Sequence, residues 1–143
     1  MSDNKPMVGV VMGSDSDWPL VQKGCATLES FGVPYETRVI SAHRTPEEAI
    51  AYSKGAEARG IKVIIACAGG AAHLAGVLAA GTVLPVVGVP VATVAVGSAG
   101  PVNAALLAVQ ILGTADSALR EKFRAHKESL KAKVAAANER IHA

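Results

Sequence analysis

The side chains best suited to chemistry gather in short turns that each follow an apolar run. The turn after residues 8–12 reads GSDSDW and contains Ser14, Ser16 and Asp17. Its hydroxyls precede an expected helix, whose free backbone N–H groups favour an anion such as phosphate. A carboxylate would repel phosphate, so Asp17 is better suited to accept hydrogen bonds from sugar hydroxyls. The alternative is that one of these residues only caps the helix.

A second polar turn follows residues 34–40 and reads SAHRT, beginning at Ser41. It contains His43, and histidine can exchange protons near neutral pH. The neighbouring Arg44 can bind phosphate or carboxylate through two parallel hydrogen bonds. The alternative is a surface histidine–arginine pair in a capped loop.

A third turn follows residues 62–66 and reads AGGAAHL. Gly69 and Gly70 would allow a ligand to approach the backbone closely, and Ala71 follows them. His73 would lie in the first turn of the next helix, where it could also be a packing residue bonded to backbone. A fourth glycine-rich turn, residues 97–100, carries no ionisable group.

Strands and helices alternate along the chain and would position these turns. Apolar runs predict strands at 8–12, 34–40, 62–66, 84–89 and 91–96, and periodic segments predict helices at 17–31, 71–80, 99–112 and 115–140. A further helix begins after Thr45, with Pro46 at its first position, Glu48 closing a capping box and Gly60 after its end. This order predicts an α/β fold: a flavodoxin-like, three-layer α/β/α arrangement around a parallel sheet, with a long C-terminal helix. Ligands of such sheets bind beyond the carboxyl ends of the strands, where the polar turns lie.

The C-terminal helix differs in character from the others. A sparse apolar stripe, including Phe123, Leu130 and Val134, lies on a lysine-rich background. Two interpretations stay open: a solvated helix lying on its own domain, or an arm packing on a neighbouring subunit. We expect residues 1–143 to form one domain, with 114–143 as the helical arm.

Composition excludes several classes of protein. Half of the 143 residues are hydrophobic and only 18% are charged, which excludes a disordered chain. The net charge of +2 gives no indication of nucleic-acid binding. Cys25 and Cys67 lie far apart, form no metal motif and fit a reducing compartment. The first residues contain no apolar segment typical of a secretory signal, so we expect a cytoplasmic protein.

The stretch from Val63 to Gly113 contains no aspartate, glutamate, lysine or arginine over 51 residues. Such a stretch indicates burial in a sheet core, in a subunit interface or in a membrane. Glycines and prolines divide it into pieces too short to span a bilayer, so we expect no membrane insertion. The chain also contains 27 alanines, whose small side chains favour packing against further copies of the chain.

Standard sequence motifs for nucleotide, metal and serine-hydrolase sites are absent from the chain. Serine, aspartate, histidine, arginine and paired glycines instead converge on one edge of the predicted sheet. This set favours a phosphorylated small molecule handled by acid–base chemistry without a metal.

The motifs GSDSDW, SAHRTP, AGGAAHL and NAALLA (residues 13–18, 41–46, 68–74 and 103–108) together resemble the bacterial class I PurE family. These enzymes are the N5-carboxyaminoimidazole ribonucleotide mutases of purine biosynthesis, and the resemblance runs from about Val8 to Leu112. It implies a flavodoxin-like fold, a homo-octamer, a ribonucleotide substrate and no cofactor. It also implies an isomerase that moves a carboxylate from the exocyclic nitrogen of the substrate to ring carbon C4, through CO2 held in the pocket.

The resemblance further implies roles for individual residues. His43 matches the general acid/base of the family. The remaining matches are substrate-binding positions, with Arg44 on the phosphate: Ser14, Ser16, Asp17, Ser41, Arg44, Gly69, Gly70, Ala71 and His73. A direct CO2-dependent aminoimidazole ribonucleotide carboxylase is an alternative function. So is a non-catalytic module that binds phosphosugars or nucleotides.

The chain departs from the family most clearly after Val89. There the family carries about twenty further residues, including a helix, before the strand that matches residues 91–96. Such a segment is also required on physical grounds, because parallel neighbouring strands need a crossover of a dozen or more residues. Here a single proline separates Val89 from Val91. Either the sequence omits a crossover that the protein has, which we favour, or the deletion is real and the C-terminal half is reorganised. Smaller departures are Cys67 for a usual glycine and Ala75 for a usual proline.

Overall fold

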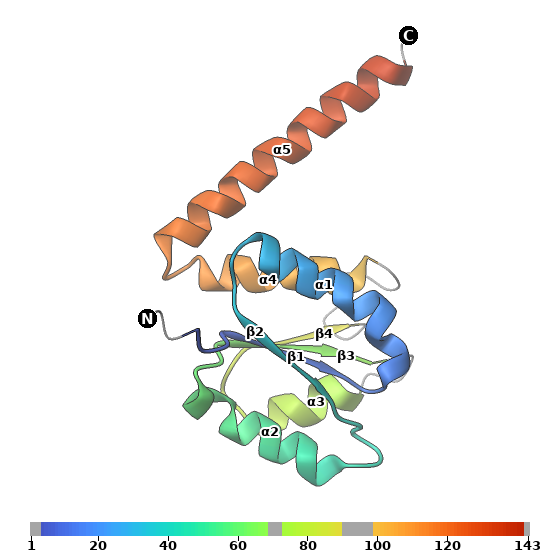
Figure 1. Ribbon diagram of the computed structural model, residues 1–143, viewed down its shortest axis with the longest axis vertical. Coiled ribbons are helices and arrows are strands. Elements are labelled where there is room, and N and C mark those ends of the chain that lie inside the picture. The colour runs from blue at the N-terminus through green and yellow to red at the C-terminus, as the bar shows by residue number, and fades with distance from the viewer. Residues whose placement is uncertain (1–3, 69–72, 90–98, 142–143) are drawn as a thin grey trace.

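A parallel sheet forms the centre of the molecule. The computed structural model describes residues 4–68, 73–89 and 99–141 (Figure 1). Its four strands are β1 (Val8–Met12), β2 (Tyr35–Val39), β3 (Val63–Cys67) and β4 (Val86–Val89). They pair in parallel in the order β2-β1-β3-β4. The predicted strand at 91–96 lies outside the described residues.

Helices cover both faces of this sheet (Figure 1). After β1 come the short 3-10 helix η1 (Asp15–Asp17) and α1 (Trp18–Ser30). The next helices are α2 (Pro46–Arg59) and α3 (His73–Ala80), followed after β4 by α4 (Gly100–Leu112) and α5 (Ser117–Ile141). Helices α1 and α4 pack together on one face, and α2 and α3 cover the other. The predicted three-layer α/β fold with a parallel sheet is therefore confirmed.

Two hydrophobic cores result from this layering. β1 and β3 are apolar at almost every position and buried along their whole length, as expected for strands covered on both faces. Side chains that alternate along them pack on one side against α1 and α4 and on the other against α2 and α3. This rigid centre fixes the carboxyl ends of the strands, from which the polar turns leave.

Helix α2 begins and ends near the predicted residues, but its start is held differently. Gly60 ends it in the left-handed conformation, with φ of 98°, as a glycine after a helix commonly does. The predicted capping box is wrong, because the Thr45 side chain makes no capping hydrogen bond. Its hydroxyl instead donates to the carbonyl of Ser41 at 3.0 Å and accepts from the Ser41 N–H at 3.2 Å. Thr45 therefore stabilises the preceding turn and does not cap the helix with its side chain.

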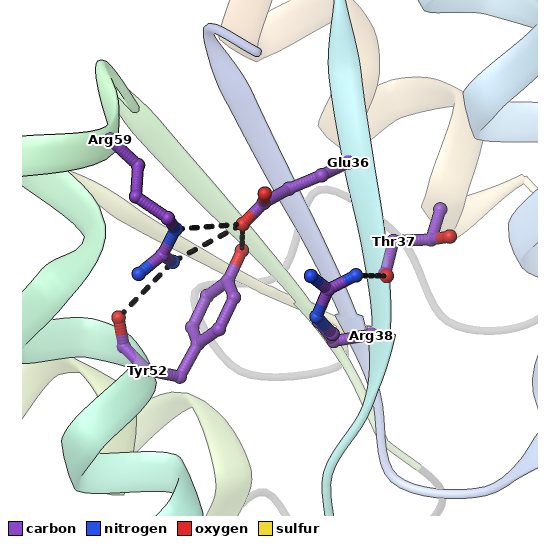
Figure 2. Close-up of polar contacts among 5 residues, drawn as sticks. All are labelled: Glu36, Thr37, Arg38, Tyr52 and Arg59. Carbon is purple, nitrogen blue, oxygen red and sulfur yellow. Dashed lines mark hydrogen bonds and ion pairs between the residues drawn. The ribbon is translucent and has the colours of Figure 1, made fainter. Parts of the chain in front are cut away.

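A polar cluster ties α2 to the edge strand β2 (Figure 2). Glu36 Oε1 accepts a hydrogen bond from the Tyr52 hydroxyl at 2.8 Å and an ion-pair contact from Arg59 at 3.2 Å. The Arg59 guanidinium also lies 4.6 Å from the centre of the Tyr52 ring. Burial, together with the bond to Glu36, raises the pKa of the Tyr52 hydroxyl, which keeps it a hydrogen-bond donor.

Helix α5 leaves the body of the fold beyond α4 and projects away from it (Figure 1). Leu119 near its start is buried, whereas Leu130, Val134 and Ile141 further along are exposed. The helix therefore does not lie along its own domain. Among the described helices, none is both long and apolar enough to cross a bilayer.

Candidate functional site

Three strands end at the same level and deliver the polar turns to one place. In the sheet register Met12 lies beside Val39 and Cys67, the last residues of β2 and β3. Two hydrogen bonds extend this alignment past the strand ends: Gly13 N–H donates to the Cys67 carbonyl at 3.0 Å, and Ile40 N–H donates to the Met12 carbonyl at 2.9 Å. The turns after β1, β2 and β3 must therefore meet at the carboxyl edge of the sheet.

A cavity of about 360 Å³ lies at this edge. Six of the predicted site residues line it, together with four small or apolar neighbours: Ser14, Ser16, Asp17, Ser41, His43, His73, Gly13, Ala42, Ala68 and Leu74. The walls combine hydroxyls, one carboxylate and two imidazoles with short aliphatic groups. Such a mixture suits a small polar ligand with several hydroxyl groups.

The turn after β1 presents two linked hydroxyls and one carboxylate. Ser16 Oγ donates to Ser14 Oγ at 2.9 Å, and Ser14 Oγ also accepts from the Ser16 N–H at 3.3 Å. Ser14 thus caps η1, which is the alternative that the sequence left open for this turn. Asp17 stands at the start of α1 but makes no side-chain capping bond. Its carboxylate is therefore available to a ligand in the cavity.

The turn after β2 is braced by its own serine and threonine. Thr45 N–H donates to the Ser41 carbonyl at 2.8 Å, and Arg44 N–H donates to Ser41 Oγ at 3.2 Å. These bonds hold the loop as one tight turn between β2 and α2. His43 and Arg44 project from it as exposed side chains.

The two histidines of the site form a hydrogen-bonded pair. His43 Nε2 lies 2.5 Å from His73 Nδ1, and the two rings meet edge to face with centroids 4.8 Å apart. They come from different elements, the turn after β2 and the first residue of α3. The sequence placed both at one edge of the sheet but gave no signal that they touch.

Cys67 is the last residue of β3, next in sequence to the lining residue Ala68, but it is not equipped to act as a nucleophile. It is buried, and burial is the main cause that raises the pKa of its thiol to about 12, with smaller contributions from Cys25 and Asp17. At neutral pH the thiol stays protonated, and only the thiolate is strongly nucleophilic. Cys67 therefore acts as a small apolar residue of the hydrophobic core.

Not every predicted site residue lines the cavity. Arg44 is described and exposed but is not one of the lining residues. Gly69, Gly70 and Ala71 lie outside the described residues. Conversely, four residues that line the cavity were not predicted as site residues: Gly13, Ala42, Ala68 and Leu74. Their only signal in the sequence is their place beside the polar residues of the same turns. Across residues 4–68, 73–89 and 99–141, no cluster of three or more histidine, cysteine or acidic side chains could hold a metal ion.

Proteins with similar sequences match most of the length of this chain. The AIR carboxylase family matches residues 7–92 and 87–133. An N5-carboxyaminoimidazole ribonucleotide mutase of Pyrococcus horikoshii is 50% identical, covering 94% of this chain and 88% of the relative. A phosphoribosylaminoimidazole carboxylase of Saccharomyces cerevisiae is 49% identical over 83% of this chain and 24% of the yeast protein.

A solved structure agrees with the fold. The crystal structure of Treponema denticola PurE superposes with a TM-score of 0.80 at 26% identity, covering 94% of this chain and 98% of that one. This similarity extends the agreement in sequence to the arrangement of strands and helices.

The matches also locate the departure seen in the sequence. The family matches in two segments that overlap at residues 87–92, where the crossover is missing. The alignment with the Pyrococcus protein runs over 157 positions, more than the 143 residues of the chain, so it contains residues of the relative without a counterpart here. Outside this junction the match is continuous across the site. The chain belongs to the AIR carboxylase family, the family of the PurE proteins.

Proposed function

We propose that this protein is an N5-carboxyaminoimidazole ribonucleotide mutase, an isomerase of purine biosynthesis. The observation that carries the proposal is His43, an imidazole in a cavity lined by hydroxyls and one carboxylate, within a chain 50% identical to a curated mutase. Imidazole is the side chain best suited to give and take protons at neutral pH.

The reaction needs one group that both donates and accepts a proton. The bond between the exocyclic nitrogen and the carboxylate carbon breaks, CO2 leaves, and the nitrogen keeps the electron pair and takes a proton from His43. Ring carbon C4 then attacks the CO2, and the neutral His43 removes the C4 proton. The histidine ends as it began, which is consistent with a reaction that needs no external acid or base.

The remaining site residues would bind the ribonucleotide. Asp17, unused as a helix cap, is suited to accept hydrogen bonds from ribose hydroxyls. Ser14 and Ser16 add hydroxyl donors close to the start of α1, and Arg44 would reach the phosphate from outside the cavity wall. Ser41 contributes chiefly by bracing the loop that carries His43. Gly69, Gly70, Ala71 and His73 complete the predicted binding set.

The test is the conversion of N5-carboxyaminoimidazole ribonucleotide by the wild-type protein and by a His43→Asn variant. Asparagine keeps a polar group of similar size but cannot exchange protons, so we expect turnover to fall by at least ~100-fold. The matched control is His126→Asn, a histidine on α5 far from the cavity, which should leave turnover unchanged. Substantial turnover by His43→Asn would contradict the assignment.

Direct carboxylation of aminoimidazole ribonucleotide with CO2 is the second candidate, favoured by the name of the yeast relative. The same residues could serve it, since it forms the same bond between C4 and CO2. Supplying the wild-type protein with either the carbamate substrate or aminoimidazole ribonucleotide plus bicarbonate separates the two. A mutase uses the carbamate far faster at equal concentration.

We also propose that the protein is cytoplasmic and assembles as a homo-oligomer, with an octamer as the expected state. The charge-free stretch 63–113 includes α3, β4 and α4, so none of these three elements contains an aspartate, glutamate, lysine or arginine. Val83, which lies in sequence between α3 and β4, is 89% exposed. A second copy of the chain presents the same charge-free surface, and α5 offers a further contact along Leu130 and Val134. Light scattering coupled to size-exclusion chromatography would measure the assembly; a monomer would contradict the proposal.

A further inference from the structure

We propose that His73 acts on His43 and not on the substrate: it is a positioning residue that fixes the orientation and the tautomer of the His43 ring. The inference rests on the proposed function, in which His43 exchanges protons with the substrate. It assigns His73 a role different from the substrate contact implied by the family resemblance.

The first support is the geometry of the pair. The 2.5 Å between His43 Nε2 and His73 Nδ1 leaves room for one hydrogen between them. One nitrogen must therefore carry the hydrogen and the other the lone pair. The pair consequently couples the tautomer of one ring to that of the other.

The second support is that the His43 side chain has little else to hold it. It is exposed, and exposed side chains change rotamer freely unless a partner restrains them. Within the described part of the chain, His73 is the hydrogen-bond partner of the His43 ring. The other ionisable groups nearby are Asp17 from the turn after β1 and Arg44 from the same loop.

The proposed proton transfer sets the direction of the hydrogen bond. Neutral His43 must keep a free lone pair to take up the C4 proton, and a neutral imidazole has one N–H and one lone pair. If His43 accepted at Nε2, His73 would occupy that lone pair, so His43 donates from Nε2 and His73 accepts at Nδ1. Neutral His43 then carries its hydrogen on Nε2 and its lone pair on Nδ1, so Nδ1 is the atom that takes up a proton.

Nitrogen-15 NMR of histidine-labelled protein tests this without any assay of turnover, because the two tautomers give distinct nitrogen shifts. In the wild-type protein we expect neutral His43 in one tautomer, with hydrogen on Nε2. In His73→Phe, which keeps a ring but has no nitrogen, we expect shifts averaged over both tautomers. His126→Asn assigns its own signal and should leave those of His43 unchanged.

Kinetics on the same variants separate positioning from substrate binding. Loss of positioning should lower kcat by about tenfold or more while KM changes little. His73→Asn places a polar amide atom near the position of Nδ1 and should recover part of kcat, whereas His73→Phe should not. Circular dichroism of each variant checks that the protein is folded, and the wild-type NMR spectrum tests the proposal even if a variant fails to fold.

Several results would overturn the inference. One is a mixture of His43 tautomers in the wild-type protein, and another is an unchanged tautomer in folded His73→Phe. A variant that raises KM with kcat intact would return His73 to the role of substrate contact. Failure of the proposed function looks different: His43→Asn would keep its activity while the tautomer of wild-type His43 stayed fixed.

Discussion

Gly9 in β1 is the position at which a single methyl group should test the packing of α2 on the sheet. A Cβ at Gly9 would overlap the Tyr52 hydroxyl and lie 3.3 Å from Tyr52 Cζ. Tyr52 is only 8% exposed, and its hydroxyl is bound to Glu36, which Arg59 also contacts (Figure 2). The ring cannot move away without breaking that cluster.

The expected cost of Gly9→Ala follows from these contacts. Overpacking a close-fitted core costs about 1–3 kcal/mol. If Tyr52 moves aside to relieve the overlap, its hydroxyl loses the hydrogen bond to the Glu36 carboxylate, which contributes about 1.5–3 kcal/mol. The structure takes the cheaper route, at about 2 kcal/mol. Replacing a strand glycine returns ~0.5–1 kcal/mol, so we expect the free energy of unfolding to fall by about 1–1.5 kcal/mol.

The matched background is Tyr52→Phe, which removes the hydroxyl that the new methyl group would overlap. In that background the nearest atom of residue 52 is the ring carbon Cζ, at 3.3 Å. Gly9→Ala should then leave the free energy of unfolding nearly unchanged. Urea unfolding followed by circular dichroism at one protomer concentration measures all four proteins of the cycle. An equal cost of Gly9→Ala with and without the hydroxyl would refute the reasoning.

Three further predictions concern other parts of the chain. Gly24→Ala would place its Cβ 2.6 Å from the Pro101 carbonyl oxygen and force α1 and α4 apart. We expect urea unfolding to show a loss of about 2 kcal/mol in the free energy of unfolding. Gly76→Ala is the control in a helix, because a Cβ there meets nothing within 4 Å and should not destabilise the protein. Because burial raises the pKa of Cys67 from 9.0 to about 12, its contribution to folding is present below pH 9 and is lost as the pH rises toward 12, and a Cys67→Ala variant should lose less stability over that interval. An intact mass of 14.5 kDa means that the crossover is absent, whereas a mass at least ~1.3 kDa higher means that the protein contains it.

The sequence predicted the sheet and helices well because their signals are local. The β-branched run of β3 and the proline and glycine that bound α2 each act within a few residues. The predicted capping box does not form because the Thr45 hydroxyl bonds to the backbone of Ser41 instead of to the first turn of α2. The cluster of Glu36, Tyr52 and Arg59 depends on β2 and α2 meeting in space, which no local pattern encodes.

The site, like the fold, has features that the sequence predicts and features that only the tertiary structure shows. Sequence order placed the polar turns at one edge of a parallel sheet, since a parallel sheet brings the carboxyl ends of its strands together. The register that aligns Met12, Val39 and Cys67 is set by packing over the whole sheet. The contact between His43 and His73 also depends on this packing. The two residues are 30 positions apart in the sequence, yet His43 Nε2 lies 2.5 Å from His73 Nδ1. Residue types therefore predicted which groups meet, and the tertiary structure supplies how they are bonded.

The layering also bears on the missing crossover. β2 to β3 and β3 to β4 both step toward the same edge of the sheet, and their helices α2 and α3 both lie on one face. Because crossovers between parallel strands are right-handed, a further step past β4 would need its helix on that same face, beside α3. α4 lies on the opposite face, packed against α1, so it is not that crossover. A parallel fifth strand beside β4 would therefore require residues that the 143-residue sequence does not contain between Val89 and Gly100.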